Sequence, residues 1–247
     1  MTSAFWLNTT VKIFILYLIL YGTGSLVFHK DVKVNYTRKM NHFALFFMPV
    51  FLDKIIPYGK SIELVLLGIA ITFCCLTILI KPVRSRVHIA RRMFLSIDRP
   101  EDRPYTLKWI STQLIAGYAV LYPAVVLFIK AGYSSLILIP VLINGIGDGL
   151  AEPIGVRFGK HKYKARALFS KRIYERSLEG SSCVFFTGIA ILFLFKSSFS
   201  EFEFLWALAV LPIAMTITEA VSPHTWDNPF LFITGYTILY LIKTVPY

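Results

Sequence analysis

Long apolar runs separated by short polar or charged segments dominate the chain. A helix needs roughly 20 residues to cross about 30 Å of hydrocarbon. Eight runs approach this length and predict membrane-spanning helices: 9–28, 43–57, 62–80, 109–129, 134–150, 181–196, 202–221 and 229–243. The pattern therefore predicts an all-α polytopic membrane protein with about seven or eight transmembrane helices, in a single helical membrane domain over residues 1–247.

Two of these runs are irregular. The run 43–57 contains Asp53, Lys54 and two prolines, so it is either a span or a re-entrant or interfacial segment. The run 134–150 ends in the sequence NGIGD, residues 144–148, which is poorly suited to face lipid and better suited to line a cavity.

Composition supports a membrane protein and gives it an orientation. Of the 247 residues, 56% are hydrophobic and 16% charged, and the mean hydropathy is +0.63. The net charge of +12 is concentrated: if the spans alternate, the loops 29–42, 81–108 and 151–180 share one side and hold 20 of the 26 Lys and Arg residues. The positive-inside rule makes that side cytoplasmic, together with loop 222–228, and both termini non-cytoplasmic. Topology thus explains the charge, and we expect no nucleic-acid partner.

Other segments fit the same interpretation. The first span has little positive charge before it, which favours an uncleaved anchor over a signal peptide. The three cysteines lie in apolar spans without the spacing of a metal or disulfide site, and we interpret them as packing residues. The loop 81–108 mixes apolar and basic residues, as an interfacial amphipathic helix does.

The first of four clusters that carry candidate chemistry is TRKMNHF, before the second span. On a helix, Arg38 and Lys39 share a face with His42, because these residues are four and three positions apart. The three side chains are candidates for binding phosphate, with His42 a possible proton acceptor. The alternative is that Arg38 and Lys39 anchor a helix end to anionic headgroups.

The second cluster is NGIGDGLAEPIGVRFGK, residues 144–160. Asp148 and Glu152 are four residues apart, and Asn144 lies one turn earlier, so a helix would align three oxygen ligands of the kind that Mg²⁺ prefers. Pro153 disfavours the α conformation at Glu152 unless the helix is broken or kinked there. The glycines, including Gly147, Gly155 and Gly159, leave room for a phosphate chain or permit close helix packing.

The third cluster is the basic run from Arg157 to Arg176 and the RSLEGSS that ends it. Most of the run is ordinary positive-inside charge, and Arg176 is its candidate catalytic member. Ser177, Gly180 and Ser181 begin the sixth span, where the N-terminus of a helix favours an anion. Glu179 suits the first turn of a helix in any case.

The fourth cluster is TEAVSPHTWDNP, residues 218–229. Glu219, Asp227 and Asn228 bring two carboxylates and an amide into a short segment, which indicates metal or nucleotide binding. Capping of a helix is the alternative role of Asp227. His224 is a possible base or a solvated loop histidine.

Taken in order, these motifs resemble the CTP-dependent lipid kinases, which include dolichol kinase, phytol kinase and yeast-type diacylglycerol kinase. The resemblance rests on Arg38-Lys39-x-x-His42, Asp148-x-x-Ala151-x-x-x-Gly155-x-x-Phe158-Gly159, Ser177-x-x-Gly180-Ser181, Glu219 and Asp227-Asn228. It covers residues 38–229. The family usually has lysine at the position of Arg176, and the segment between Gly159 and Arg176 is longer here.

The resemblance implies an integral-membrane enzyme that transfers the γ-phosphate of CTP, or of another nucleoside triphosphate, to the hydroxyl of a prenol, polyprenol or diacylglycerol. It implies Mg²⁺ bound by Asp148 and Asp227, with Glu152, Glu179 or Glu219 as further ligands. Asp148, Arg176 and His42 are the candidate catalytic residues. The candidate phosphate and nucleotide contacts are Arg38, Lys39, Asn144, Gly147, Gly155, Gly159, Ser177, Gly180, Ser181 and Asn228.

Two other functions stay open at this point. The stretches VRFGKHK and RSLEG resemble the CDP-diacylglycerol synthases, although that family's C-terminal Lys-Asp signature is missing. A transporter or channel would have polar residues through the depth of the membrane, whereas the acids and amides here concentrate at one predicted surface. The expected location is a plasma membrane if the source is bacterial, or an ER or plastid membrane if eukaryotic, with the active site on the cytoplasmic face.

Overall fold

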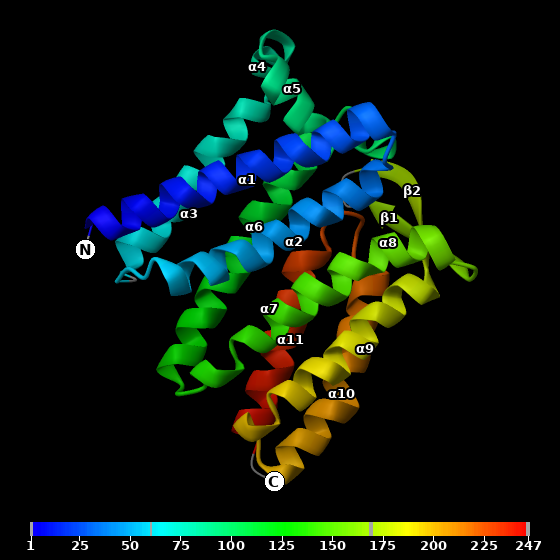
Figure 1. Cartoon of the computed structure of the whole chain (residues 1–247). Coiled ribbons are helices and arrows are strands. Elements are labelled where there is room, and N and C mark those ends of the chain that lie inside the picture. The colour runs from blue at the N-terminus through cyan, green and yellow to red at the C-terminus, as the bar shows by residue number, and fades with distance from the viewer. Residues whose placement is uncertain (1, 60, 168–169, 246–247) are drawn as a thin grey trace. The chain divides into compact units, whose positions relative to one another are not determined.

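The computed structural model describes residues 2–59, 61–167 and 170–245 (Figure 1). Within this part of the chain the fold is predominantly helical, as the sequence predicts. The chain divides into two compact units, unit 1 (Met1–Ser111) and unit 2 (Thr112–Tyr247). Helix α6 (Thr106–Lys130) begins in the first unit and continues into the second.

Unit 1 is built on three longer helices, α1 (Thr2–Lys30), α2 (Val34–Ile55) and α3 (Ile62–Leu76). The short helices η1 (Thr77–Leu79), α4 (Lys81–Arg86), α5 (His88–Leu95) and η2 (Pro100–Asp102) follow. Leu79, Met93, Phe94 and Ile97 form its hydrophobic core cluster. Helix α5 crosses α1 closely at Gly24, where an added Cβ would lie 1.9 Å from the Arg92 carbonyl oxygen.

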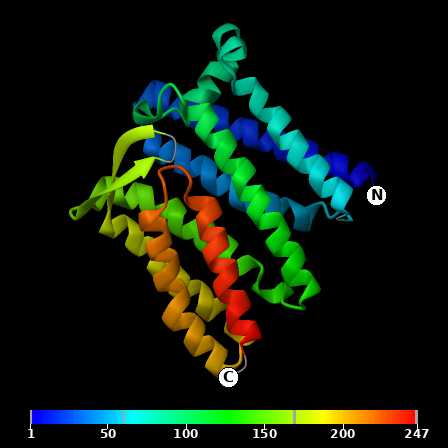
Figure 2. The ribbon, with the colours of Figure 1, turned by 180° about the vertical axis from the view of Figure 1, so that it is seen from behind.

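Unit 2 begins with a nearly continuous helical segment that changes type along its length. It consists of η3 (Ser134–Leu136), α7 (Leu138–Leu142), the π-helical η4 (Ile143–Asp148) and α8 (Gly149–Phe158). A β-hairpin follows, formed by β1 (Lys162–Ala167) and β2 (Ser170–Ser177). The chain ends with α9 (Leu178–Leu194), η5 (Lys196–Ser198), α10 (Glu201–Val221) and α11 (Asp227–Thr244). Figure 2 shows α10 and α11 side by side.

Five helical segments are long and apolar enough to cross a membrane: 3–30, 62–79, 106–130, 134–158 and 201–221. Each coincides with a predicted span. The remaining three predicted spans are also helices, but α9 has only 17 residues, and α2 and α11 are more polar. These lengths and compositions are those of a helical membrane protein.

Burial distinguishes one of the five segments. In the most apolar stretch of 134–158, 56% of the residues are buried, compared with 11% in 106–130 and 6% in 62–79. Ile139, Ile143, Val184, Leu211 and Leu231 are fully buried in unit 2. The segment 134–158 is therefore surrounded by protein, which agrees with the prediction that its NGIGD end does not face lipid.

The predicted loops prove to be largely structured. Helix α1 extends to Lys30 and α2 begins at Val34, so the TRKMNHF cluster lies inside α2 rather than in a loop. The loop 81–108 contains α4, α5 and η2. The loop 151–180 contains most of α8 and the β-hairpin, which is the departure from an all-helical fold.

Candidate functional site

The β-hairpin of unit 2 carries Arg176 toward the helices. Its strands are antiparallel, and Tyr163 pairs with Arg176 and Ala165 with Tyr174. Ala165 and Tyr174 are buried, while the alternate residues Lys164 and Glu175 are exposed. This period of two is that of a strand with one face against the protein. Arg176 therefore lies on the inner face of the hairpin, whereas the charge of the segment predicts a loop.

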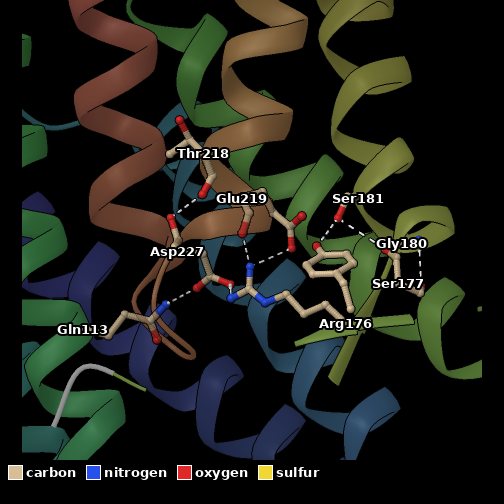
Figure 3. A network of polar contacts seen from close by, with 10 residues as sticks. Gln113, Arg176, Ser177, Gly180, Ser181, Thr218, Glu219 and Asp227 are labelled. Carbon is tan, nitrogen blue, oxygen red and sulfur yellow. Dashed lines mark hydrogen bonds and ion pairs between the residues drawn. The ribbon is translucent and has the colours of Figure 1, made fainter. Parts of the chain in front are cut away.

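Arg176 lies between two carboxylates from different helices (Figure 3). Its Nη1 is 3.1 Å from Oε1 of Glu219 in α10, and it also donates to the Glu219 backbone carbonyl. Its Nη2 is 3.6 Å from Oδ2 of Asp227 at the start of α11. Gln113 of α6 donates from Nε2 to the other oxygen of Asp227 at 3.3 Å. The third and fourth sequence clusters are thus brought together by one guanidinium.

The guanidinium stays charged in this environment. Its side chain is 12% exposed. Burial alone would lower the pKa of Arg176, but the carboxylates of Asp227 and Glu219, with smaller contributions from Tyr163 and Asp148, raise it above the usual value. Asp148 is therefore close enough to act electrostatically on Arg176, and the second cluster joins the other two.

The π-helical turn η4 positions the second cluster. Asn144 and Asp148 are both buried in it, at 0% and 4% exposed, and Asn144 donates to the backbone carbonyl of Asn228 at 3.5 Å. A π-helical turn inside an α-helical segment is frequently found at functional sites. The helix continues through Pro153, so the break that Pro153 made possible at Glu152 does not occur. Glu152 lies in the first turn of α8 and is half-buried.

We call these six residues, Asn144, Asp148, Arg176, Glu219, Asp227 and Asn228, the Arg176 cluster. Three buried side-chain oxygens in it accept no hydrogen bond: Asn144 Oδ1, Glu219 Oε2 and Asn228 Oδ1. A buried acceptor without a donor is costly and is usually satisfied by a ligand, an ion or water. The cluster thus has acceptor capacity that its own side chains leave unused.

Tyr163 borders the cluster and was missed by the sequence analysis. Its hydroxyl is 2.6 Å from the Ser181 Oγ, and Ser181 in turn donates to the Ser177 backbone carbonyl at 3.3 Å. Burial, followed by the negative charge of Glu219, raises the pKa of Tyr163, so its hydroxyl stays neutral. The alternation of Lys-Tyr-Lys-Ala-Arg-Ala over 162–167 is the signal that predicts its inward position.

The start of α9 is capped by the chain itself. Ser177 accepts a hydrogen bond from the Gly180 backbone N–H at 3.1 Å, as an N-cap residue does. Glu179 accepts from the backbone N–H of His161 and lies 2.7 Å from its ring. Ser177 and Glu179 therefore have structural roles at this helix end. Their assignment to phosphate and metal stays a prediction.

The glycines of the second and third clusters permit close packing. An added Cβ would lie 2.9 Å from the Val184 Cα at Gly147, 2.9 Å from the Ser177 Oγ at Gly155, and 2.6 Å from the Ala151 backbone oxygen at Gly180. At Gly159 it would lie 2.3 Å from the Gly155 carbonyl oxygen. These positions support the packing alternative, because the space beside each glycine is filled by protein.

The first cluster belongs to unit 1. Arg38, Lys39 and His42 all lie on α2; Lys39 is 4% exposed, and the His42 ring contacts the Phe46 ring in a tilted arrangement with centroids 4.6 Å apart. Their predicted participation with the residues of unit 2 stays a prediction. His224 stacks on Tyr174, with centroids 3.5 Å apart, and its backbone N–H donates to Arg166. The segment before α11 is thereby fastened to the hairpin.

The residues predicted to bind Mg²⁺ do not form a complete metal site on their own. Among the described residues, no group of three or more His, Cys, Asp and Glu side chains is arranged to hold a metal ion. Glu219 and Asp227 share Arg176, and Glu179 is paired with His161. One or two carboxylates beside unused amide oxygens still suit an ion that completes its shell with substrate phosphates and water. The cluster fits Mg²⁺ in that form.

Comparison with protein-family models, with curated proteins and with solved structures gave no match.

Proposed function

We propose that the protein is an integral-membrane lipid kinase that transfers the γ-phosphate of CTP, or of another nucleoside triphosphate, to the hydroxyl of a lipid alcohol. One observation carries the proposal. Residues from three motifs that are far apart in the sequence meet in the Arg176 cluster, with one guanidinium, three carboxylates and three unused acceptor oxygens. Transfer of a phosphoryl group depends on such a positioned set of charges.

The chemistry proposed is an in-line displacement. The lipid hydroxyl attacks the γ-phosphorus, the bond from that phosphorus to the β–γ bridging oxygen breaks, and CDP leaves. A carboxylate of the Arg176 cluster would accept the hydroxyl proton, with His42 as the alternative acceptor. Arg176 stabilises negative charge on the transferring group, and it is held for this by Glu219 and Asp227. Asp148 and Asp227 would hold Mg²⁺, which supplies further charge neutralisation to the triphosphate.

The proposal includes an orientation. With eight alternating spans and non-cytoplasmic termini, the hairpin would be cytoplasmic. The Arg176 cluster would then lie on the face where nucleotide is available. The lipid alcohol would reach it from the bilayer. The concentration of Lys and Arg in 29–42, 81–108 and 151–180 supports this orientation.

The test uses purified protein in proteoliposomes with Mg²⁺, CTP and a panel of prenols, polyprenols and diacylglycerol. Radioactive phosphorus in the γ-position of CTP should appear in the lipid, and ATP, GTP and UTP in parallel identify the preferred base. With phosphatidate as acceptor and label in the α-position, CDP-lipid would instead identify a cytidylyltransferase. Absence of label in any lipid with either nucleotide would contradict the proposal.

A further inference from the structure

Helices α4 and α5 of unit 1 (Figure 1) contribute no residue to the Arg176 cluster and carry a basic and apolar surface of their own. Residues 80–95 include five Lys or Arg residues and contain neither Asp nor Glu. Apart from Pro82 and Ser85, the exposed side chains of this segment are apolar or basic. We call them the α4–α5 surface: Ile80, Val87, Ile89, Lys81, Arg86, His88 and Arg91.

The opposite side of these helices is fixed in unit 1. Ala90 and Met93 are 0% and 1% exposed, and Met93 belongs to the hydrophobic core cluster. Helix α5 packs against α1 at Gly24. The α4–α5 surface is therefore displayed on a rigid base, because its inner side cannot rotate outward without breaking the core.

The basic residues divide into two groups. Arg84 lies over the Phe94 ring at 3.6 Å, and Arg92 lies over the Phe28 ring at 3.8 Å with a nitrogen 2.8 Å from the His29 ring. These two arginines are used inside unit 1. Lys81, Arg86 and Arg91 are exposed, and Arg91 also donates to the Ser85 carbonyl at 3.4 Å, which links α5 to α4. Three cations thus remain directed to the surroundings.

The position of the α4–α5 surface along the chain indicates that it lies at the surface of a membrane. The segment Ile62–Leu79 has the length and hydropathy of a membrane span, and Ile80 and Lys81 follow it immediately. A basic segment directly after a span lies at the headgroup level of the bilayer. Val87 and Ile89 are 43% and 58% exposed among the cations, which suits a surface whose apolar side chains reach the acyl boundary.

We propose that the α4–α5 surface binds the headgroups of anionic phospholipids in the bilayer that α3 crosses. Charge complementarity selects this partner: three exposed cationic side chains, in a segment that contains no acidic residue, favour a negatively charged lipid over a zwitterionic one. The apolar residues favour a lipid interface over a soluble phosphate compound. The proposal is independent of the proposed kinase activity.

The experiment maps lipid contacts in the full-length protein. The protein is reconstituted in phosphatidylcholine with a trace of photoreactive phosphatidylglycerol or, separately, photoreactive phosphatidylcholine with the diazirine at the same position. After irradiation, mass spectrometry measures the lipid adducts on peptides from residues 80–95. We expect more phosphatidylglycerol than phosphatidylcholine adducts at low salt, and a decrease of the excess as salt rises.

Matched variants separate charge from structure. The triple variant Lys81→Gln, Arg86→Gln and Arg91→Gln should lose the phosphatidylglycerol excess, by up to about five-fold for each charge removed. The control variant Lys54→Gln, Lys130→Gln and Lys196→Gln removes the same number of charges from exposed lysines elsewhere and should leave the phosphatidylglycerol excess unchanged. The charge-preserving variant Lys81→Arg, Arg86→Lys and Arg91→Lys should retain it. Equal adducts of the two lipids on the wild-type protein, or loss of the excess in the charge-preserving variant, would overturn the proposal.

Discussion

A polar cluster between α1 and α2 of unit 1 and the Arg176 cluster of unit 2 are built differently. In unit 1, Lys12 Nζ is 2.5 Å from Asp53 Oδ1, and Asn8 donates to Asp53 and to the Leu52 and Ile56 carbonyls. We call Asn8, Lys12 and Asp53 the Lys12 cluster. One cation there meets one carboxylate. In the Arg176 cluster of unit 2, one guanidinium is within electrostatic range of three carboxylates, Asp148, Glu219 and Asp227.

From the difference in charge balance we infer that the Lys12 cluster is a structural contact and the Arg176 cluster a ligand site. A balanced pair between α1 and α2 neutralises itself and holds two helices together. The Arg176 cluster has more carboxylates than cations and three unused acceptors, compared with one, Asn8 Oδ1, in the Lys12 cluster. A cation or a donor-rich ligand would complete the Arg176 cluster. We therefore expect changes to the Arg176 cluster to act on catalysis and changes to the Lys12 cluster to act on stability alone.

The largest expected effect is on transfer activity. Asp148→Asn keeps the size of the side chain and removes its charge, and it should lower the rate of phosphoryl transfer by about a thousand-fold. The measurement is radioactive γ-phosphate appearing in the lipid. Asp53→Asn is the matched control and should retain transfer. Equal loss in both variants would remove the distinction between the two clusters.

The next effect is on the stability of unit 2. Arg176→Gln leaves the buried carboxylate of Glu219 and the partly buried carboxylate of Asp227 without their cation, and we expect it to lower the free energy of unfolding by about 3–5 kcal/mol. Adding Glu219→Gln should restore part of that stability without restoring transfer. Denaturant unfolding in mixed micelles measures the stability of the single and the double variant, and the transfer of radioactive γ-phosphate to lipid measures their activity. If Arg176→Gln is as stable as wild type, Arg176 does not balance these carboxylates.

A smaller loss of stability is expected in unit 1. Lys12→Met leaves Asp53 without its ion pair; because the two side chains are 17% and 19% exposed, solvent weakens the effect to about 2 kcal/mol. The double variant Lys12→Met and Asp53→Leu should recover the loss. Transfer activity should be unchanged in both. A Lys12 variant with normal stability and lost activity would show that the Lys12 cluster is functional.

The smallest expected effect is a loss of stability from disturbing the packing of α8 against α9, next to the Arg176 cluster. Gly180→Ala places a Cβ 2.6 Å from the Ala151 backbone oxygen, so α9 and α8 must move apart, at a cost of about 1–2 kcal/mol. Gly68→Ala is the control, because no atom lies within 4 Å of the added Cβ. If the two alanine variants unfold alike, the close contact of α8 and α9 is not required.

Local patterns predict most of the helices and the members of the Arg176 cluster. Apolar runs locate the spans, since a run of that length must be helical in lipid. The polar ends of those runs single out Asp148, Glu219 and Asp227, because carboxylates at the end of a span need a partner or a cavity. Arg176 stands out as the basic residue directly before the small residues that begin α9. These inferences require only neighbouring residues.

The remaining features depend on competing signals or on distant contacts. The many charges of 151–180 indicate a loop, whereas the alternation of charged with apolar or aromatic residues over 162–167 indicates a strand. The first signal hides the second, so the β-hairpin and the inward position of Tyr163 are not predicted. The π-helical turn at 143–148 has no local signature apart from its glycines. That Arg176 reaches both Glu219 and Asp227 depends on how the hairpin, α10 and α11 pack, and spacing within one element does not reveal it.

Equilibrium binding of radioactive CTP tests the central claim most directly, since it does not require the lipid acceptor to be known. Wild type and the Asp53→Asn variant should bind CTP in the presence of Mg²⁺ and lose most of that binding when EDTA removes the ion. Asp148→Asn should bind at least about ten-fold more weakly with Mg²⁺ present. Mg²⁺-dependent binding of CTP that is unchanged in Asp148→Asn, or no binding by wild type, would contradict the assignment of the Arg176 cluster as the nucleotide site.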